Sequence, residues 1–402
     1  MEVHRLTDYR ECEAALRNPD LRQAMYDAGA VITEGTLLML HGKPHLKRRE
    51  IESRVFRRNF FKYYEKEVFP ATLEHTLAPF VAAGGGDLIE LGYRLTVNLT
   101  ADFAGVDRPL KTVEETEQLI RLTKKFSEAA TMVHSTRDKT ELEAEVREAI
   151  AEFDTVFLTP SITRREDLLA QFQAGGIEED DLPRDVLTVI LRGQDELQFD
   201  HSQRIREIGF YMQAGSHSTA NSVVHAIEEI LAWAGDDEAR WERLEDPVFV
   251  QHCVHESLRL HPASPEAWRA PTCPMHIEGA GDLEVEELII LDFFNANRDP
   301  ELFGEDADIF EPDRPAPRGA MKTGLSFGFG THHCLGRELD GGVLVKPGTP
   351  PEKAQFGIVP LIVIKLLSLG ARKVADDPPT PDTKTVRPNW GRYPIQFARE
   401  MT

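Results

Sequence analysis

The spacing of apolar residues changes once along this chain, and the change limits the folds that the chain can adopt. From about residue 8 to about residue 260, apolar side chains recur at helical spacing. Three such amphipathic runs lie at 114–131, 140–157 and 204–234. After His261, prolines interrupt the pattern, and residues 283–291 mix β-branched and acidic side chains in the manner of a strand. The sequence therefore predicts a mainly α-helical protein with a small β-rich portion.

The length of 402 residues is more than one domain usually contains. The chain nevertheless shows no internal repeat, no low-complexity tract and no linker that would separate independent units. Residues 300–330 are rich in proline and glycine and have few periodic apolar positions, which predicts a long ordered loop. We expect one domain over residues 1–402, with a helix-rich part at 8–260 and a β- and loop-rich part at 261–402.

The charge balance excludes several classes of partner. A formal net charge of -22 and a pI near 5.1 argue against binding to nucleic acids or to anionic membranes, because the summed field repels polyanions. No stretch approaches the length of apolar sequence that a membrane span requires, and the first residues are polar. The four cysteines lie far apart without any CxxC pair, which favours neither a zinc site nor a disulfide framework. We expect a cytoplasmic protein.

The most informative stretch is Phe327-Gly-Phe-Gly-Thr-His-His-Cys-Leu-Gly336, in which glycines surround the lone Cys334. Glycines remove side-chain bulk and permit unusual dihedral angles, so a flat cofactor can approach this backbone closely. Amides at the start of a helix stabilise a thiolate and are expected to hold its pKa down. These features suit a thiolate ligand to iron, and the alternative is a buried structural cysteine beside a glycine-rich turn.

This stretch resembles the haem-binding loop of the cytochromes P-450, Phe-x-x-Gly-x-His/Arg-x-Cys-x-Gly. The matching residues are Phe327, Gly330, His332, Cys334 and Gly336. A second match is Glu256-Ser-Leu-Arg259, whose spacing puts both charges on one helix face. In the family this pair joins an arginine from a later loop, for which Arg314 is the counterpart here, and the run at 297–300 also resembles the family's.

The resemblance implies haem b as the cofactor and Cys334 as the ligand of its iron. It also implies that His45, Arg49, Arg269 and His332 bind the haem propionates. His45 and Arg49 belong to a basic cluster at 43–49, which is otherwise read as a solvated helix face. Substrate contacts are expected from Leu37, Leu38, Met39, Ala214 and Pro265, although each of these is equally compatible with an ordinary core.

The segment Ala214-Gly-Ser-His-Ser-Thr219 departs from the family's oxygen-binding pattern, Ala-Gly-x-Asp/Glu-Thr. His217 takes the position of the acid and Ser218 that of the threonine, with Thr219 one step beyond. The family uses this segment to deliver protons to bound dioxygen. Three hypotheses remain: a proton relay through His217 and Ser218, a helix kink that turns His217 away, and ligation of the iron by His217.

A second departure follows the cysteine, where the family continues as one helix. Residues 340–357 are rich in glycine and proline, which break a helix, and apolar periodicity resumes only at Ile358. We predict an inserted loop on the cysteine side of the haem, near the usual docking place of electron donors. The insertion either changes the choice of donor or is a tolerated surface loop.

The resemblance implies a monooxygenase of the soluble bacterial type that inserts one oxygen atom from dioxygen into a small apolar organic substrate. The chain has no flavin or iron–sulfur motif, so electrons are expected from a ferredoxin or flavodoxin with its reductase. Two alternatives remain. One is a peroxide-driven peroxygenase or an enzyme that rearranges its substrate, and the other is a non-catalytic haem ligand sensor with His217 near or on the iron.

Overall fold

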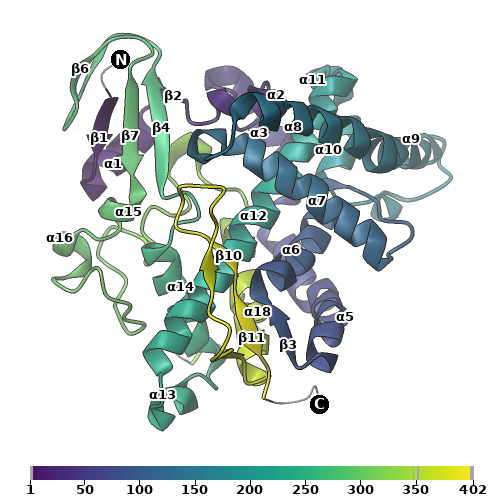
Figure 1. Ribbon diagram of the computed structural model, residues 1–402. Coiled ribbons are helices and arrows are strands. Elements are labelled where there is room, and N and C mark those ends of the chain that lie inside the picture. The colour runs from purple at the N-terminus through teal and green to yellow at the C-terminus, as the bar shows by residue number, and fades with distance from the viewer. Residues whose placement is uncertain (1–2, 347, 351–352, 399–402) are drawn as a thin grey trace.

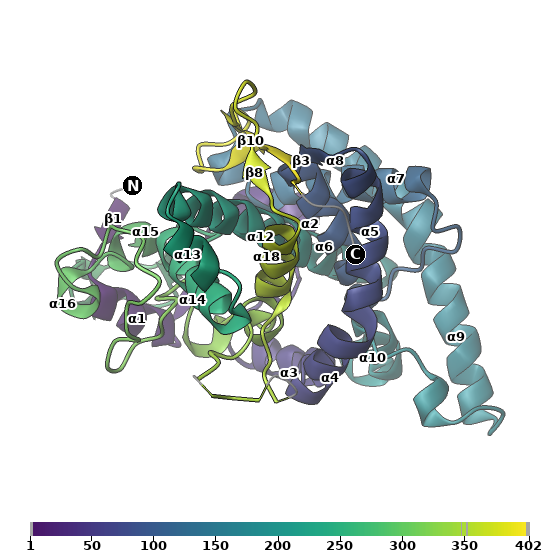
Figure 2. The same cartoon turned by 90° about the horizontal axis from the view of Figure 1, so that it is seen from below.

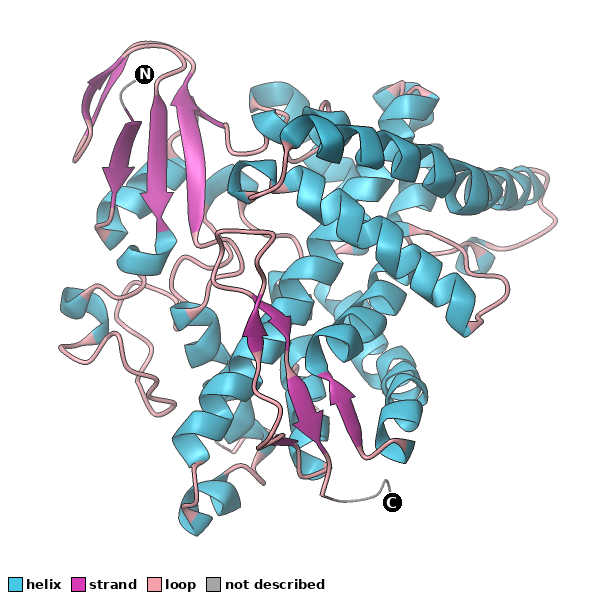
Figure 3. Ribbon diagram, viewed as in Figure 1, coloured by secondary structure: helices cyan, strands magenta, loops and turns pink. Residues whose placement is uncertain are grey.

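The computed structural model describes residues 3–346, 348–350 and 353–398, and it confirms a mainly α-helical fold with small sheets (Figures 1 and 3). The longer helices are α1 (Tyr9–Arg17), α3 (Gly42–Glu52), α5 (Phe69–Ala82), α6 (Leu88–Ala104), α7 (Val113–Ala130), α8 (Lys139–Phe153), α9 (Thr159–Gln173), α12 (His201–Ala234), α14 (Pro247–Leu260) and α18 (Ile358–Ser368). The shorter ones are α2 (Ala30–Thr33), α4 (Arg58–Tyr63), α10 (Val186–Arg192), α11 (Gln194–Leu197), α13 (Glu238–Arg243), α15 (Phe293–Ala296), α16 (Pro300–Phe303) and α17 (Arg337–Asp340). Within the described ranges, no helix combines the length and the hydropathy needed to cross a membrane.

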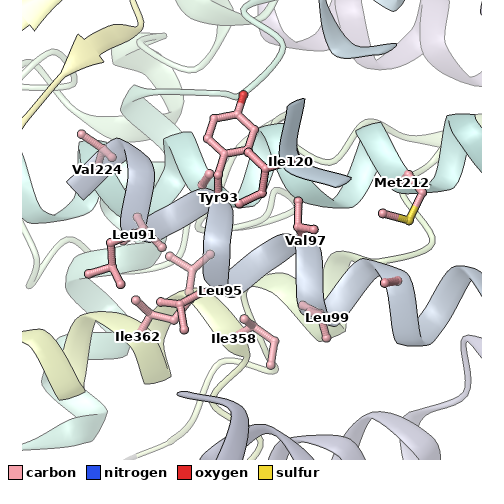
Figure 4. Packing of buried hydrophobic residues seen from close by; sticks show 14 of the residues in the cluster. Leu91, Tyr93, Leu95, Val97, Leu99, Ile120, Met212, Val224, Ile358 and Ile362 are labelled. Atoms are coloured by element: carbon pink, nitrogen blue, oxygen red, sulfur yellow. The ribbon is translucent and has the colours of Figure 1, made fainter. Parts of the chain in front are cut away.

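The long helix α12 is the central element of the helical part (Figure 2). Asp200 caps its first turn by accepting the N–H of Gln203, and the Gln203 side chain accepts the N–H of Asp200 in return. The helix packs against α6, α7, α14 and α18, and most of its middle is buried. Buried side chains of α6 and α18 pack together beneath it, among them Leu95, Ile358 and Ile362 (Figure 4). This packing fixes the position of α12 in the interior.

The β-rich part is built mainly from one four-stranded sheet with the order β1-β7-β4-β2. Its strands are β1 (Val3–Leu6), β2 (Leu21–Gln23), β4 (Glu266–Pro271) and β7 (Leu288–Asp292), and β1 pairs with β7 in parallel. A short hairpin of β5 (Met275–Ile277) and β6 (Gly281–Leu283) lies beside it. The strand-like pattern at 283–291 is confirmed at its two ends, in β6 and β7, but the chain turns between them, where Glu286 has a φ of 67°.

Two small sheets lie near the C-terminal end of the described chain. One has the order β3-β11-β8, with β3 (Gly85–Asp87), β8 (Arg372–Lys373) and β11 (Pro394–Gln396), and the other pairs β9 (Thr380–Pro381) with β10 (Trp390–Arg392). The loop between β9 and β10 is held on the chain after α7. Val386 donates its N–H to the His134 carbonyl at 2.9 Å, and Thr136 donates its N–H to the Lys384 carbonyl at 3.1 Å.

The predicted break after the cysteine is present. Helix α17 has one turn, and α18 begins only at Ile358. Between them, the described residues 341–346, 348–350 and 353–357 are irregular, but they are anchored on α14 and on the segment Tyr64–Val68. The Gln251 amide donates to the Phe356 carbonyl at 2.9 Å and accepts the Val345 N–H at 2.9 Å, while Glu65 accepts the Phe356 N–H at 2.8 Å. The inserted loop is therefore part of the packed structure.

Candidate functional site

A cavity of about 350 Å³ lies between α12 and the loop that carries Cys334. Its other walls come from α3, α6, β4 and the loop between β9 and β10, so elements that are distant in sequence meet there. The lining is largely apolar, with Leu37, Phe103 and Ala214 among its members. Many polar side chains also line it, and such groups orient an organic molecule that binds in a site of this kind.

Cys334 lines this cavity at the end of the glycine-rich loop. Its N–H donates to the Phe327 carbonyl at 2.8 Å, which closes the loop into a compact turn. Gly328 within that turn has a φ of 63°, which a residue with a Cβ rarely adopts. Because α17 begins directly after Gly336, the sulfur lies at the start of a helical turn and faces the cavity.

The expectation that helix amides hold the pKa of this cysteine down is wrong. Burial raises the pKa of the Cys334 thiol to about 11, and the nearby Asp340 carboxylate adds to this rise. The Gly336 N–H, Arg49 and Arg337 act in the opposite direction but do not outweigh burial. A thiol whose pKa is raised in this way loses its proton when it binds a metal ion, since the cation stabilises the thiolate directly. The sulfur is therefore suited to ligation of a cation.

Four nitrogen-bearing side chains form a rim at one end of the cavity, and they are the four predicted from the sequence: His45, Arg49, Arg269 and His332. The rings of His45 and His332 lie 3.9 Å apart between centroids. Burial lowers the pKa of His45 to about 4 and that of His332 to about 2, and the neighbouring Arg49 lowers both further. Burying these four hydrogen-bond donors together, with no carboxylate among them, costs free energy unless an anionic group binds at the rim.

The rim also contains an unsatisfied buried atom. Nε2 of His45 is buried without a hydrogen-bond partner in the described chain. The Arg269 guanidinium bonds only the neutral Gln23 amide and the Trp268 carbonyl, and Arg49 donates to the His333 carbonyl at 2.6 Å. A ligand with two carboxylates facing this rim would satisfy these donors. Together with Cys334, the rim fits an iron porphyrin with two propionates.

The predicted charge network behind the loop is formed. Arg259 bonds Glu256 through two nitrogens at 2.6 and 3.0 Å, and Arg314 bonds the same carboxylate at 2.9 Å. Glu256 and Arg259 have no exposed surface. Arg259 also donates to the carbonyls of Asn297 and Ala307, at 2.7 and 2.6 Å, which fixes the irregular chain between α15 and the cysteine loop.

Comparison with protein families gives the decisive observation. The model of the family described as Cytochrome P450 matches residues 222–339, a stretch that includes Glu256, Arg259, Arg314 and Cys334. The match shows that this part of the chain is similar to the cytochrome P450 family. The cofactor of this family is haem b, bound through a cysteine thiolate, in agreement with the sulfur and the rim described above.

Individual relatives match this chain over part of their length. A taurochenodeoxycholic 6 alpha-hydroxylase of Sus scrofa is 26% identical over 150 residues, which cover 33% of this chain and 30% of the relative. A germacrene A hydroxylase of Saussurea costus is 29% identical over 177 residues, which cover 38% of this chain and 36% of the relative. The chain thus spans about a third of the length of these curated relatives.

Solved structures match the chain along nearly its whole length. CalO2 is 20% identical with a TM-score of 0.75, covering 99% of this chain and 91% of that one. P450BioI, solved in complex with a hexadec-9Z-enoic acid ligated acyl carrier protein, is 19% identical with a TM-score of 0.73, covering 98% of this chain and 92% of that one. These likenesses show the fold.

On the α12 side of the cavity, His217 forms a hydrogen bond with Tyr93, a residue that belongs to none of the sequence motifs. Its Nδ1 lies 2.6 Å from the hydroxyl of Tyr93, a buried residue of α6. The imidazole lines the cavity, and α12 is helical through this region, so the hypothesis that His217 faces away is wrong. Burial lowers the pKa of His217 to about 3, and the charges of Arg387 and Lys124 add to the effect. The ring is therefore neutral.

The neighbouring hydroxyls have different partners from His217. Ser218 donates to the Ala214 carbonyl at 2.5 Å, one turn earlier in the same helix. Thr219 donates to Oδ1 of Asp340, on α17, at 2.5 Å. Asp340 also lines the cavity, and burial raises its pKa to about 6, while the bond from Thr219 opposes that rise. The oxygen-binding segment has no acidic residue of its own, but Thr219 bonds the Asp340 carboxylate, which comes from the helix after Cys334.

Asp340→Asn is expected to change how stability depends on pH. Because the pKa of Asp340 is raised from 3.8 to about 6 in the fold, the native state holds this proton more tightly than the unfolded chain does. Its contribution to stability is complete below the unfolded pKa and is lost as the pH rises through about 6. The variant should therefore be more stable than the wild type at neutral pH, measured by thermal unfolding from about pH 4 to about pH 8. Parallel curves for the two proteins would contradict this.

Three residues proposed from the sequence do not line the cavity. Met39 follows a tight turn in which its N–H and that of Leu40 both bond the Thr36 carbonyl, so Leu37 and Leu38 face the cavity and Met39 does not. Pro265 is replaced in the lining by its neighbours Ala263 and Ser264. Gly330, with a φ of 69°, packs against α1, where an added Cβ would lie 2.4 Å from the Leu16 carbonyl oxygen.

Sequence reasoning also missed three cavity or near-cavity residues. Tyr93 sits in an ordinary amphipathic helix and carries no motif. Asp340 was noticed only as the start of the insertion, and Arg387 lies in a loop without periodicity. Of these three residues, only Tyr93 had a feature that could have pointed to the site, because a buried tyrosine needs a hydrogen-bond partner for its hydroxyl.

Proposed function

We propose that this chain is a cytochrome P450, a haem-thiolate monooxygenase that inserts one oxygen atom from dioxygen into an organic substrate. The observation that carries the proposal is the meeting of Cys334 and the donor rim on one largely apolar cavity beneath α12. The haem, when bound, supplies an iron centre whose thiolate ligand favours cleavage of the O–O bond. Cys334 is the proposed ligand, and the rim residues hold the propionates and so fix the plane of the cofactor.

The chain's own residues prepare the cavity for proton delivery. The Tyr93 hydroxyl has no other hydrogen-bond partner in the described chain, and burial raises its pKa, so its proton is best satisfied by donation to Nδ1 of His217. The neutral imidazole then carries its own proton on Nε2 and can donate it into the cavity. An Nε2 that bears a proton has no lone pair for a metal. The Tyr93 contact therefore supports the relay hypothesis and speaks against ligation of iron by His217.

Thr219 and Asp340 form a second proton-handling pair. When Asp340 is ionised it accepts the Thr219 hydroxyl proton, as the 2.5 Å contact indicates. When Asp340 is protonated it can donate to Oγ1 of Thr219, which reverses the direction of the bond. A pKa of about 6 allows both states near neutrality. We propose that this pair replaces the acid that the oxygen-binding segment lacks.

The function is tested first by the reduced carbon monoxide difference spectrum of the purified protein. Thiolate ligation predicts the long-wavelength Soret band that gives the family its name. Turnover with a reductase-supported electron supply then separates the alternatives. Product formed from hydrogen peroxide alone, and not from reductase and dioxygen, would favour the peroxygenase hypothesis. A haem protein with no turnover in either assay would favour the sensor hypothesis.

The partners and the location remain part of the proposal. Electrons would come from a ferredoxin or flavodoxin with its reductase, because the sequence has no motif for a flavin or an iron–sulfur cluster. The described residues of the loop after α17 (341–346, 348–350 and 353–357) follow the cysteine stretch, where they can contact such a donor. We further propose that residues 1–402 act as one domain and that the protein works in the cytoplasm.

Tyr93→Phe is expected to uncouple electron use from product formation. Without the hydroxyl, Nδ1 of His217 loses its partner and the imidazole is no longer held with its proton on Nε2. Loss of one oriented proton donor should lower the product formed per NADPH consumed by about 10-fold, with the substrate dissociation constant nearly unchanged. The measurement is the ratio of product to NADPH consumed in steady state.

The double variant with His217→Ala provides the control for this positioning role. If Tyr93 acts only through His217, adding Tyr93→Phe to His217→Ala should cause no further loss. Additive losses would show that Tyr93 acts in some other way. Unchanged coupling in Tyr93→Phe alone would remove the relay from the mechanism.

A further inference from the structure

Arg387 is a buried arginine without an acidic partner. Four other buried arginines of the described chain bond carboxylates, namely Arg48, Arg165, Arg259 and Arg314. Arg269 has none either, but it belongs to the donor rim. Arg387 has 7% of its surface exposed and lines the cavity, and no ion pair to it occurs in the described chain. Burying an unpaired charge costs several kcal/mol in general, so this position is not explained by folding.

The hydrogen bonds of this guanidinium are few. Its Nη1 donates to the Ala263 carbonyl at 3.3 Å, and its Nε is buried with no partner among the described residues. Glu266 is the carboxylate whose charge reaches it, but the oxygens of Glu266 accept from Arg5 at 3.1 Å and from the Trp268 indole at 2.8 Å. The guanidinium thus has N–H donors without an acceptor in the described chain, and a bound ligand could supply that acceptor.

The backbone holds Arg387 firmly at this place. Thr385 accepts the Arg387 N–H at 3.2 Å, and Asn389 donates its N–H to the Arg387 carbonyl at 2.8 Å. The same loop is pinned to His134 and Thr136 by the backbone bonds described above. The side chain therefore enters the cavity from an anchored turn, which suits a binding residue.

We propose that Arg387 binds a carboxylate of the substrate, so that the cavity takes a molecule with an apolar body and one anionic group. This deepens the proposed monooxygenase function and rests on it. Tyr26 and Ser264 line the cavity on the same side, and Tyr26 lies within reach of the charge of Arg387, so its hydroxyl is available as a second donor. The apolar body would lie along residues such as Leu37 and Phe103.

The charges around Arg387 separate it from the haem rim. Its charge acts on His217 and on His134, which lie on α12 and directly after α7. The charges that act on His332, a rim residue, include those of His45, Arg269 and Arg49. His45, Arg49, Arg269 and His332 would hold the two haem propionates, which leaves Arg387 for an anion on the substrate side.

The test compares acids with neutral analogues in the haem-loaded protein. Octanoate, dodecanoate and phenylacetate are each paired with the alcohol of the same carbon skeleton, and binding is followed by calorimetry and by displacement of the iron-bound water. A charge-assisted contact predicts that at least one acid binds about 10- to 100-fold more tightly than its alcohol. If no acid in this set binds more tightly than its alcohol, the proposal is overturned.

Three variants locate the effect. Arg387→Gln should abolish the preference for the acid, while Arg387→Lys should retain part of it because the charge remains. Arg392→Gln, on the same hairpin but in an exposed ion pair with Asp377, should leave the preference unchanged. Because removal of an unpaired buried charge relieves its desolvation, Arg387→Gln should also raise the melting temperature of the ligand-free protein. A structural role for Arg387 predicts a lower melting temperature instead.

The haem content of Arg387→Gln distinguishes the two sources of a carboxylate. Binding of the substrate acid predicts that the variant keeps its haem and its carbon monoxide spectrum. Loss of haem together with an unchanged preference for the acid would assign Arg387 to a propionate and overturn the proposal. If the wild-type protein itself lacked a thiolate spectrum, the proposed monooxygenase function would be wrong. The calorimetric comparison of acid and alcohol would still show whether Arg387 binds a carboxylate.

Discussion

Cys334→Ser is expected to abolish the thiolate spectrum and to lower monooxygenase turnover by at least about a thousandfold, or ~4 kcal/mol in the activation barrier. A serine hydroxyl in this buried place keeps its proton far more tightly than the thiol does, and it is a poorer donor of electron density to iron. The long-wavelength band of the reduced carbon monoxide complex should therefore disappear. Haem content, measured on the purified variant, should fall as well, because the axial bond is lost.

Cys273→Ser is the matched control, since Cys273 is another cysteine of the chain but does not line the cavity. It should keep the spectrum, the haem content and the turnover of the wild type. If Cys334→Ser kept an unchanged chromophore, the iron would have a different ligand, and the proposed function would be wrong at its foundation. Equal losses in both variants would point to a general effect of removing thiols.

The sequence predicted those parts of the site that depend on short motifs. The glycine-rich loop brings Cys334 to the cavity because its spacing and its dihedral angles are local properties of the chain. The pair of Glu256 and Arg259 is also local, since an i,i+3 spacing on α14 places both groups on one face. In each case the spacing of residues within the motif largely determines where the side chains lie.

Contacts between distant elements were not predictable in the same way. The partner of His217 is Tyr93, which is 124 positions away on α6, and only the packing of α6 against α12 brings them together. Thr219 and Asp340 are 121 positions apart. The sequence shows that the oxygen-binding segment has no acidic residue. No rule of spacing, however, identifies Asp340 as the residue that faces Thr219 from another helix.

The thiol of Cys334 shows how burial can outweigh a local argument. The amides of the following turn do stabilise a thiolate, as expected, but α17 is only four residues long and its effect is small. Desolvation depends on everything that surrounds the sulfur, and that is a property of the whole fold. The expected low pKa failed for this reason, while the position of the cysteine was predicted correctly.

Glu256→Gln is expected to destabilise the fold by about 3–5 kcal/mol, because it removes the only carboxylate that bonds both Arg259 and Arg314 in the described chain. The amide has nearly the same shape, so the loss measures charge and hydrogen bonding rather than packing. Two guanidinium groups would then remain buried, with Asp306 left to bond Arg314 alone. Chemical denaturation of the haem-loaded protein gives the free energy of unfolding directly.

Asp377→Asn makes the same chemical change in an exposed ion pair with Arg392, and it should leave the unfolding curve within the error of the measurement. The comparison matters for function because the Glu256 network reaches the haem loop. Arg259 holds the Asn297 carbonyl, and the Asn297 side chain in turn accepts the Leu325 N–H at 2.7 Å, just before the cysteine stretch. Glu256→Gln should therefore also release haem faster than Asp377→Asn does. Equal haem retention in the two variants would show that the network stabilises the fold without positioning the cysteine loop.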